Sequence, residues 1–330
     1  MSTKRLEQAA QATKTAFVFP GQGSQKEGML AELAEQFSVV RDTFAEASAA
    51  LGFDLWQIAQ SGEGLDQTEN TQPVLLTASI ALWRVWLELG GIAPKYLAGH
   101  SLGEYSALVA AEAMTLADAV KLVHLRGKLM QSAVPQGTGA MAAILGLADE
   151  KVIELCQKVN ASAAGQGSVE AANYNAQGQV VIAGSTALVQ QVMAEAKEQS
   201  GKAIALPVSV PSHCTLMKPA AEKFAEALEQ TAIELPHLPV IQNVNAEIAT
   251  DVAQLRQALT AQLYQSVQWT RTMQYLQDEG VQYVVECGPG TVLSNLAKRL
   301  PNIEKAFAID SKARMEDALN AVLVAEGKIA

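Results

Sequence analysis

The sequence predicts an α/β protein whose large domain is built on a parallel sheet and carries a smaller inserted α+β module. In residues 1–131 and 210–330, short apolar segments alternate with longer helical patterns, the order that produces parallel strands. Residues 132–209 instead follow the order strand–helix–strand–strand–helix–strand, which is typical of a ferredoxin-like module. The 330 residues are 49% hydrophobic, so both parts have apolar side chains for a core.

The first part of the large domain contains two predicted strands and several helices. Pro73 suits the first turn of its helix, and Gly90-Gly91 stops that helix. Thr115 and Asp118 resemble a capping box. In chain order the elements are a strand at 16–19, a glycine-rich turn at 20–25, helices at about 28–37, 39–50 and 73–89, a strand at 96–98, and helices at about 103–111 and 116–131.

The inserted module and the second part of the large domain follow. Ser185, Asp251 and Thr270 are predicted to begin helices as N-caps. The module has strands at 141–147, 170–175, 179–183 and 202–210, with helices at 149–159 and 186–199. The remaining elements are helices at 217–230, at 252–264, after 270, after 290 and at the C-terminus, with extended segments at 239–244, 281–286 and 306–309.

Composition excludes several functional classes. The formal net charge of -10 argues against nucleic acid as a partner, because neutralising phosphates requires a basic face. The three cysteines form no CxxC or Cys/His spacing, so neither a metal site nor a disulfide framework is expected. Residues 1–14 are a polar tail without an apolar signal core, and no apolar run has the length of about 20 residues that spans a bilayer. We therefore expect a cytoplasmic protein that does not bind membranes.

Ser101 is the candidate nucleophile. It lies in Gly99-His100-Ser101-Leu102-Gly103, which matches G-x-S-x-G between a predicted strand and a predicted helix. In such a sharp turn the glycines relieve crowding and the serine hydroxyl projects at the helix start, where the amide of Leu102 can stabilise an oxyanion. The alternative is a glycine-bounded turn with an N-cap serine, because the motif also arises by chance in a chain with 23 glycines. The strand–turn–helix context favours the nucleophile.

A serine hydroxyl needs an adjacent base, and the chain has four histidines. His213 follows a predicted strand, and residues just past strand ends line the ligand crevice of open α/β sheets. The alternative for His213 is a histidine in a surface loop. The other three lie beside the serine, within a helix among leucines, and in a proline-flanked loop: His100, His124 and His237. A third member of a triad would come from Glu286 or Asp310 near strand ends, although structural salt bridges are the more common role for such residues.

Arg126 is the candidate ligand for an anionic group of a substrate. Its neighbours three and four positions away on the predicted helix are apolar: Leu122, Val123, Leu129 and Met130. A guanidinium on such a face is costly to desolvate unless it meets an anion, and a carboxylate would bind it in bidentate geometry. A snorkelling arginine and an internal salt bridge are the alternatives that the residues alone leave open.

Several motifs occur together along the chain. They are Phe17-Val18-Phe19-Pro20-Gly21-Gln22-Gly23-Ser24-Gln25, Gly99-His100-Ser101-Leu102-Gly103-Glu104-Tyr105, Arg126, Asn173-Tyr174-Asn175 followed by 178–184, Pro211-Ser212-His213-Cys214 and Glu286-Cys287-Gly288-Pro289-Gly290. In combination they resemble the malonyl-CoA:acyl carrier protein transacylase family of bacterial type II fatty acid synthesis. The resemblance extends from about residue 15 to about residue 310 and is far more specific than the serine motif alone.

This resemblance implies a fold and a set of roles. The fold would be a large domain with an α/β-hydrolase-like core and an inserted ferredoxin-like subdomain. Ser101 would be the nucleophile and His213 the base. The backbone amides of Gln22 and Leu102 would form the oxyanion hole.

The resemblance also implies residues that bind the substrate and orient the base. Arg126 would bind the free carboxylate of the malonyl group. A backbone carbonyl orients the histidine in this family, and Gln262 occupies that position here. Asn175 resembles a substrate-binding position near the active site. Many relatives have proline where this chain has Gln177, which bears on the local loop shape.

The implied activity is transfer of malonyl from malonyl-CoA to acyl carrier protein through a malonyl-serine ester, without metal or cofactor. Acyl carrier proteins are acidic, and Lys298-Arg299 is the contiguous basic candidate for docking them. The alternative for this pair is a solvated helix C-terminus that favours positive charge. Rival functions are a serine hydrolase or thioesterase, a transferase of methylmalonyl or another acyl group, and a non-catalytic scaffold that binds carrier protein. We expect a monomer.

Overall fold

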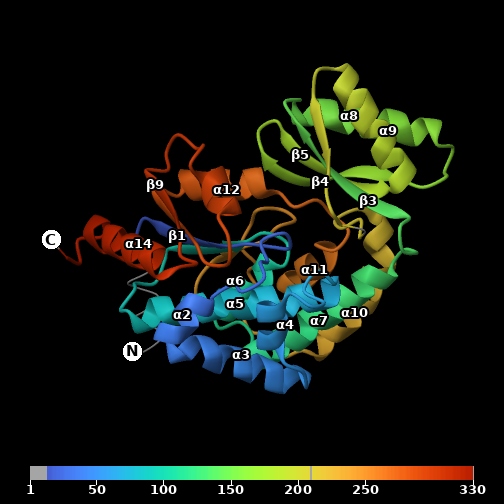
Figure 1. The fold of residues 1–330 in the computed structure, drawn as a ribbon. Helices are drawn as coiled ribbons and strands as arrows, with labels where there is room; N and C mark the ends of the chain where they lie inside the picture. The colour runs from blue at the N-terminus through green and yellow to red at the C-terminus, as the bar shows by residue number, and fades with distance from the viewer. Residues whose placement is uncertain (1–12, 209, 330) are drawn as a thin grey trace.

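A five-stranded parallel sheet forms the centre of the large domain. The computed structural model describes residues 13–208 and 210–329, so most of the predicted polar tail at 1–14 lies outside the described residues. The strands are ordered β7-β2-β1-β8-β9. Figure 1 labels β1 and β9 of this sheet. The strand bounds are Thr15–Phe19 for β1, Tyr96–Gly99 for β2, Val240–Ile241 for β7, Tyr283–Glu286 for β8 and Lys305–Ala308 for β9. Every pairing is parallel, which confirms the predicted α/β class.

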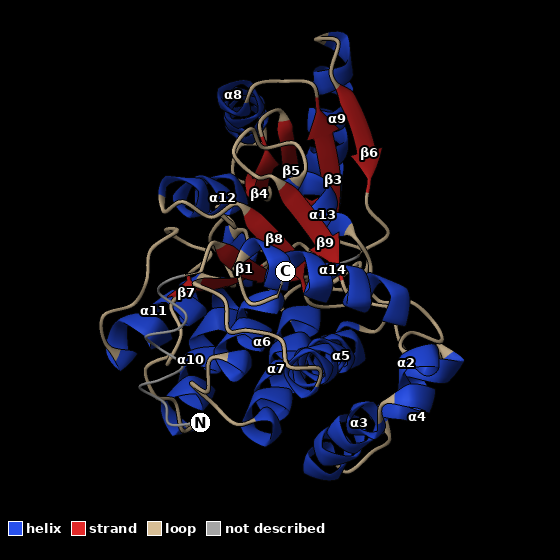
Figure 2. Ribbon diagram, turned by 90° about the vertical axis from the view of Figure 1, so that its left-hand side faces the viewer, coloured by secondary structure: helices blue, strands red, loops and turns tan. Residues whose placement is uncertain are grey.

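Helices cover this sheet on both faces and bury its central strand. All five residues of β1 are buried, as expected for a parallel strand with apolar layers on both sides. Figure 2 shows the helices of the large domain around the sheet. They are α2 (Ala31–Gln36), α3 (Ser38–Leu51), α4 (Leu55–Ser61), α5 (Thr68–Glu88), α6 (Gly103–Ala110), α7 (Leu116–Ser132), α10 (Lys218–Gln230), α11 (Val252–Ala261), α12 (Trp269–Asp278), α13 (Val292–Ala297) and α14 (Lys312–Ala325). Within the described part of the chain, no helix has the length and apolar character needed to cross a bilayer.

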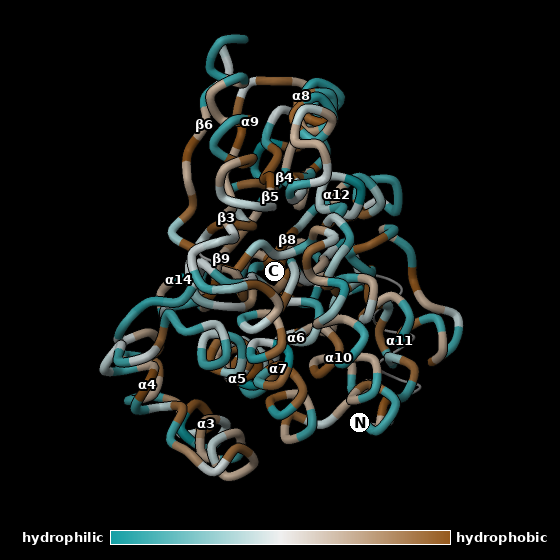
Figure 3. The backbone as a smooth tube through the Cα atoms, turned by 90° about the vertical axis from the view of Figure 1, so that its right-hand side faces the viewer, coloured by the Kyte–Doolittle hydropathy of each residue, from teal (hydrophilic) through white to brown (hydrophobic). Residues whose placement is uncertain are grey.

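A second sheet, antiparallel, lies outside the large domain's sheet. Its strands are β3 (Gly139–Leu145), β4 (Val169–Ala176), β5 (Gln179–Ser185) and β6 (Lys202–Ala205), ordered β4-β5-β3-β6. Helices α8 (Asp149–Ser162) and α9 (Thr186–Glu198) complete the predicted βαββαβ order and pack on the strands in a separate apolar cluster. Figure 3 shows the hydrophilic turn between α9 and β6 at the outer tip of this lobe. All these elements fall inside the module predicted at 132–209, whose exact boundaries stay a prediction.

The last strand of the module is shorter than predicted. A strand was expected over 202–210, but β6 ends at Ala205. The amide of Leu206 still donates to the carbonyl of Met141 at 2.9 Å, and the chain then leaves the sheet. Leu206 and Val208 line a cavity between the two lobes. In the sequence, their apolar side chains look like the continuation of the strand. In the structure, these side chains line the cavity instead.

Helix α5 begins five residues before the predicted turn, so placing Pro73 in its first turn was wrong. Pro73 lies inside the helix and has no N–H to donate to the carbonyl of Glu69. That carbonyl instead accepts a hydrogen bond from Nδ1 of His124 on α7 at 2.8 Å. His124 thus compensates for the proline and joins two core helices. Helix α4 had no counterpart in the predicted elements.

Two predicted caps are made and two are not. Thr115 and Asp251 cap α7 and α11 through side-chain oxygens that accept from backbone amides. Ser185 occupies the N-cap position of α9, but its side chain makes no capping bond. Thr270 lies inside α12, and its hydroxyl donates to the carbonyl of Tyr174 at 3.0 Å. This hydrogen bond connects the large domain to β4 of the module. A local capping pattern does not predict such a tertiary contact.

Candidate active site

Ser101 lies in a sharp turn between β2 and α6. Its φ of 51° falls in the left-handed region, which is strained for a non-glycine residue and is often found at functional sites. A Cβ atom on Gly99 would overlap the backbone of Gly103, and one on Gly103 would overlap the carbonyl of Phe19. The close approach of helix to strand therefore requires glycine at both ends of the motif.

The structure brings Ser101 and His213 together across 112 positions of sequence, with Oγ and Nε2 2.7 Å apart. Nδ1 of His213 lies 2.7 Å from the backbone carbonyl oxygen of Gln262. A carbonyl oxygen only accepts, so Nδ1 carries the proton and Nε2 can accept from the serine hydroxyl. The amide of His213 also donates to the carbonyl of Leu263 at 3.0 Å, which fixes the backbone that carries the ring.

His213 is kept neutral by its surroundings. Burial and the positive charge of Arg126 lower the pKa of His213 to about 3, against the opposing effect of its bond to the Gln262 carbonyl. A neutral imidazole is the form that can take a proton from a serine hydroxyl. At neutral pH His213 is therefore in the form that can accept a proton.

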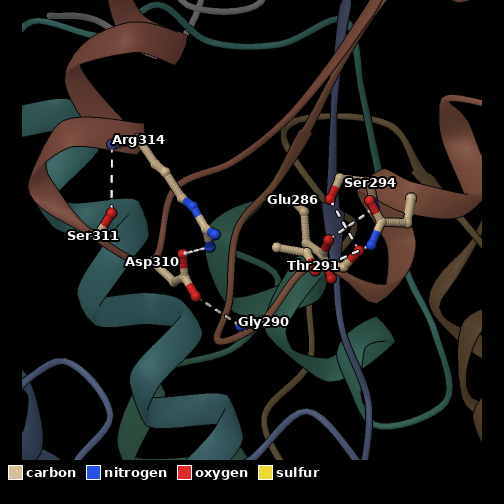
Figure 4. A network of polar contacts seen from close by, with 8 residues as sticks. Glu286, Gly290, Thr291, Ser294, Asp310, Ser311 and Arg314 are labelled. Carbon is tan, nitrogen blue, oxygen red and sulfur yellow. Dashed lines mark hydrogen bonds and ion pairs between the residues drawn. The ribbon is translucent and has the colours of Figure 1, made fainter.

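The two carboxylates considered for a triad have structural roles (Figure 4). Glu286 accepts backbone amides of the first turn of α13 at 3.1 and 2.8 Å. Asp310 accepts from the amide of Gly290 at 3.1 Å and pairs with Arg314 at 2.7 Å. Since both acids are engaged elsewhere, the carbonyl described above is the group that orients His213.

Arg126 reaches the same site from α7. Its side chain is 1% exposed, and NH2 lies 3.3 Å from Oγ of Ser101. The guanidinium donates at 2.9 Å to the side-chain oxygens of Gln72 and Gln262. Neither partner is charged, and the ion pairs of the described residues do not include Arg126. Burial excludes a snorkelling arginine, and among residues 13–208 and 210–329 Arg126 forms no salt bridge.

The predicted oxyanion donors lie next to the nucleophile. Gln22 follows β1 in the glycine-rich turn, which packs so closely on the elbow that a Cβ on Gly21 would meet the carbonyl of His100. Gln22, Leu102 and Ser101 line one cavity. The amide of Ser101 itself donates to Oδ1 of Asn243 at 2.7 Å and is unavailable for an oxyanion. Gln22 and Leu102 thus share a cavity with the nucleophile, and the role of their amides as oxyanion donors stays a prediction.

This cavity has a volume of about 310 Å³ and lies between the two sheets. Asn175 lines it, and its Oδ1 bonds Nε2 of His100 at 2.8 Å, so its polar group is turned toward the elbow. Lys298 and Arg299 are exposed at the end of α13, whose Leu293 and Leu296 line the cavity. Arg299 donates to Oε1 of Gln179, another lining residue, at 3.1 Å. The basic pair thus lies at the rim of the cavity.

Sequence reasoning missed three polar residues that support the site. Asn243 follows β7, where it bridges the amide of Ser101 and the carbonyl of Gly99 at 2.7 and 2.5 Å. Its position past a strand end was the available signal. Gln72 is a polar residue in a buried helix, and Glu104 follows the serine motif directly. Each is 1% exposed, and burial was not readable from the local pattern.

On the α/β core lie a strained serine, a neutral histidine bonded to it and a buried arginine, the groups that an enzyme of acyl transfer through serine requires. Comparisons with known proteins agree: residues 16–315 match the family described as acyl transferase domain. The malonyl CoA-acyl carrier protein transacylase of Salmonella typhimurium is 52% identical over 310 residues, 93% of this chain and 99% of the relative. That of Bacillus subtilis is 44% identical over 93% of this chain and 96% of its own length.

Solved structures give the same result. FabD from Acinetobacter baumannii has a TM-score of 0.93 and 88% identity, with 95% of this chain and 99% of that chain covered. A malonyl-transacylase in complex with the acyl-carrier protein of a type II PKS has a TM-score of 0.90 and 49% identity, with 93% and 99% covered. The chain belongs to the malonyl CoA-acyl carrier protein transacylases of the acyl transferase family. The predicted family and fold are therefore confirmed.

Proposed function

We propose that the protein is an [acyl-carrier-protein] S-malonyltransferase, which moves malonyl from malonyl-CoA to the phosphopantetheine thiol of acyl carrier protein for fatty acid synthesis. One observation carries the proposal: the side chains of His213 and Arg126 both lie within hydrogen-bond distance of the hydroxyl oxygen of Ser101. Oγ of Ser101 lies 2.7 Å from Nε2 of His213 and 3.3 Å from the guanidinium of Arg126. The names of the relatives support the same acyl group and the same acceptor.

Acylation begins when the hydroxyl of Ser101 attacks the thioester carbonyl of malonyl-CoA and gives its proton to Nε2 of His213. Arg126 holds the malonyl carboxylate, so the carbonyl carbon is presented to the serine oxygen. The backbone amides of Gln22 and Leu102 stabilise the oxyanion of the tetrahedral intermediate. The intermediate collapses to the malonyl-serine ester, and the imidazolium protonates the sulfur of coenzyme A as it leaves.

The second half-reaction reverses these steps with another thiol. His213 takes the proton of the phosphopantetheine thiol, which attacks the ester on Ser101 and receives the malonyl group. One thioester is exchanged for another, so these steps call for neither a metal nor a redox cofactor. The two substrates use the same serine in turn, and ping-pong kinetics follow.

The acceptor must reach the ester from the rim of the cavity. Lys298 and Arg299 are exposed there and present positive charge for an acidic carrier protein. A solved relative in complex with an acyl-carrier protein supports a carrier as partner. We treat the protein as a cytoplasmic monomer in this scheme. Asn175, bonded to His100 on the cavity wall, contributes a polar contact to the bound thioester.

Mass spectrometry of the intact chain after addition of malonyl-CoA tests the proposal. We expect one malonyl adduct on the wild type and none on Ser101→Ala. The adduct should disappear when carrier protein is added, with malonyl appearing on its phosphopantetheine. Loss of the adduct to water without transfer would instead indicate a thioesterase, and an adduct on the variant would remove Ser101 as the nucleophile.

A further inference from the structure

The side chain of Gln262 contacts two groups of the active site, while its main chain contacts the third. It is fully buried. Its Nε2 donates to the carbonyl of Ser101 at 3.0 Å, and its Oε1 accepts from Arg126 at 2.9 Å. A carboxamide has a donor end and an acceptor end of nearly the same shape, so its partners must set its orientation. Turned over, it would present an NH2 group to a guanidinium that only donates.

Glu104 adds a third contact that favours this orientation, together with Arg126 and the carbonyl of Ser101. Its Oε2 accepts from Nε2 of Gln262 at 2.7 Å and from the amide of Asn243 at 3.1 Å. An ionised carboxylate only accepts, so it binds the nitrogen end of the Gln262 amide and rejects the oxygen end. Such charge-assisted hydrogen bonds are stronger than neutral ones. Glu104 therefore directs the amide oxygen of Gln262 toward Arg126.

The arrangement compensates the charge of Arg126 without covering its donors. A carboxylate bonded directly to the guanidinium would occupy the groups that a substrate carboxylate needs. Here the direct partners are neutral: the amide oxygens of Gln72 and Gln262 and, at 3.3 Å, Oγ of Ser101. The negative charge of Glu104 lies one amide further away. Arg126 lines the cavity, and within residues 13–208 and 210–329 its NH1 group, which carries two hydrogens, makes one hydrogen bond, to Gln72. The guanidinium thus keeps free donor capacity in a buried site.

We propose that Glu104 is a positioning residue for acyl recognition: through Gln262 it holds the guanidinium of Arg126 beside Ser101 with donors open to the carboxylate of the acyl group. This inference rests on the proposed binding of the malonyl carboxylate by Arg126. Glu104 makes no direct hydrogen bond to Ser101 or His213; it reaches the site through the Gln262 side chain and through the amide of Asn243, whose side chain holds the amide of Ser101. Because only malonyl carries the carboxylate that Arg126 binds, loss of Glu104 should weaken malonyl transfer more than acetyl transfer.

The proposal predicts a dependence on pH. Burial raises the pKa of Glu104 to about 7, while the hydrogen bonds from Gln262 and Asn243 and the charge of Arg126 act in the opposite direction. Tyr105 is the other titratable group that faces Glu104, and burial raises its pKa, so it stays neutral at this pH. As pH rises through about 7, Glu104 becomes ionised and directs the Gln262 amide. The ratio of malonyl transfer to acetyl transfer by the wild type should therefore rise over the same interval.

The decisive variant is Glu104→Gln, measured with malonyl-CoA and with acetyl-CoA, which lacks the carboxylate. We expect kcat/KM for malonyl to fall about 10-fold or more, mainly through KM, since a hydrogen bond to a charged group has that weight. Acetyl transfer should fall less than malonyl transfer, because acetyl has no carboxylate for Arg126 to bind, so the malonyl-to-acetyl ratio is the quantity that tests the proposal. The variant should also lose the pH dependence of the malonyl-to-acetyl ratio. Glu104→Asp, which keeps the charge, should recover part of the malonyl activity.

Three results would overturn the inference. Equal losses for both acyl groups in Glu104→Gln, with a lowered thermal midpoint, would assign Glu104 a structural role. Unchanged malonyl transfer would show that the amide of Gln262 needs no such partner. If the variant does not fold, the wild type alone provides the test, and a malonyl-to-acetyl ratio that stays flat between about pH 6 and pH 8, on either side of the pKa of Glu104, rejects the role.

Arg126→Ala separates this inference from the proposed function. If that variant loses malonyl and acetyl transfer equally, the carboxylate assignment of Arg126 itself fails. If Arg126→Ala discriminates between the acyl groups while Glu104→Gln does not, only the role of Glu104 is rejected.

Discussion

At the scale of single residues, burial sets the protonation states on which the proposed chemistry depends. His213 is 3% exposed and Arg126 is 1% exposed. Burial lowers the pKa of both groups, and the charge of Arg126 lowers that of His213 further. The guanidinium remains charged because its ordinary pKa is so high, whereas the imidazole becomes neutral. The positive charge of Arg126 thus helps to keep His213 neutral.

The first prediction concerns the acyl selectivity of Arg126. Arg126→Ala should lower kcat/KM for malonyl transfer by about 100-fold, because a bidentate contact to a carboxylate is lost, and should spare or favour acetyl transfer. Parallel assays with both CoA thioesters measure the difference. Arg84→Ala, which removes a surface arginine paired with Glu46, is the matched control and should change neither rate. A common loss for both thioesters contradicts the assignment.

A second prediction follows from the charge of Arg126. Its positive charge lowers the pKa of His213, so Arg126→Ala should raise that pKa. Protonated His213 cannot act as the base, and its neutral form is populated above its pKa. The acidic limb of the acetyl-transfer profile should therefore lie at higher pH in the variant than in the wild type. An unshifted limb would mean that a group other than His213 governs it.

At the scale of elements, the contact between α5 and α7 shows how a helix accommodates proline. The carbonyl of Glu69 receives its hydrogen bond from His124 because Pro73 cannot donate one. In the sequence, Pro73 suited the first turn of a helix and His124 suited a position in the core, so neither stood out. Their relation became visible only when the start of α5 was known.

The third prediction is a double-mutant cycle on this contact. His124→Leu should destabilise the protein by about 0.5–1.5 kcal/mol, because the carbonyl of Glu69 loses its partner. In a Pro73→Ala background the same change should cost less, since the new alanine has an N–H that would restore the helical hydrogen bond. Denaturant unfolding of the four proteins gives the coupling energy. Additive effects would show that His124 does not substitute for the missing N–H.

The fourth prediction concerns the elbow between β2 and α6. Gly103→Ala should abolish transfer and destabilise the chain, because the added Cβ overlaps the carbonyl of Phe19. Gly137→Ala is the control: Gly137 has a φ of 80° but open space around it, so only the backbone penalty of about 1–2 kcal/mol applies. Thermal midpoints and malonyl-transfer rates compare the two. Equal effects would show that the overlap at Gly103 costs no more than the left-handed backbone of Gly137 does.

At the scale of the whole molecule, the site is assembled where two lobes meet, and this limits what sequence can predict. The alternation of apolar segments and helices predicted the parallel sheet, and the βαββαβ order predicted the second sheet. Ser101, His213 and Arg126 could be singled out because each is chemically unusual in its local pattern. Thr270 was misassigned because its partner, the carbonyl of Tyr174, lies in the other lobe, and Leu206 was misassigned because it lines the cavity between the lobes; no local pattern encodes either feature.

The supporting residues were harder still to predict. Glu104 and Asn243 matter through hydrogen bonds between segments more than a hundred positions apart. Only a resemblance to a known family drew attention to Gln262, and it did so for the backbone carbonyl. The side-chain bonds of Gln262 to Ser101, Glu104 and Arg126 required coordinates.

The fifth prediction belongs to the surface of the molecule. Lys298→Glu combined with Arg299→Glu should raise the apparent KM for carrier protein about 10-fold and leave that for malonyl-CoA unchanged, because attraction to an acidic partner becomes repulsion. Lys121→Glu with Lys223→Glu makes the same change in net charge at exposed positions of α7 and α10. Steady-state assays at low salt compare the pairs. A similar effect of both pairs would mean that net charge, rather than this rim, controls carrier binding.

A carbonyl rather than a carboxylate faces Nδ1 of His213, and this limits which acyl bonds the protein can cleave. When the imidazole takes up a proton, a neutral dipole stabilises the new cation less than a full negative charge does. The catalyst is thereby suited to acyl groups with good leaving groups, such as thioesters. Amides have poorer leaving groups and need a stronger base and acid. We therefore expect that amides are not cleaved at this site.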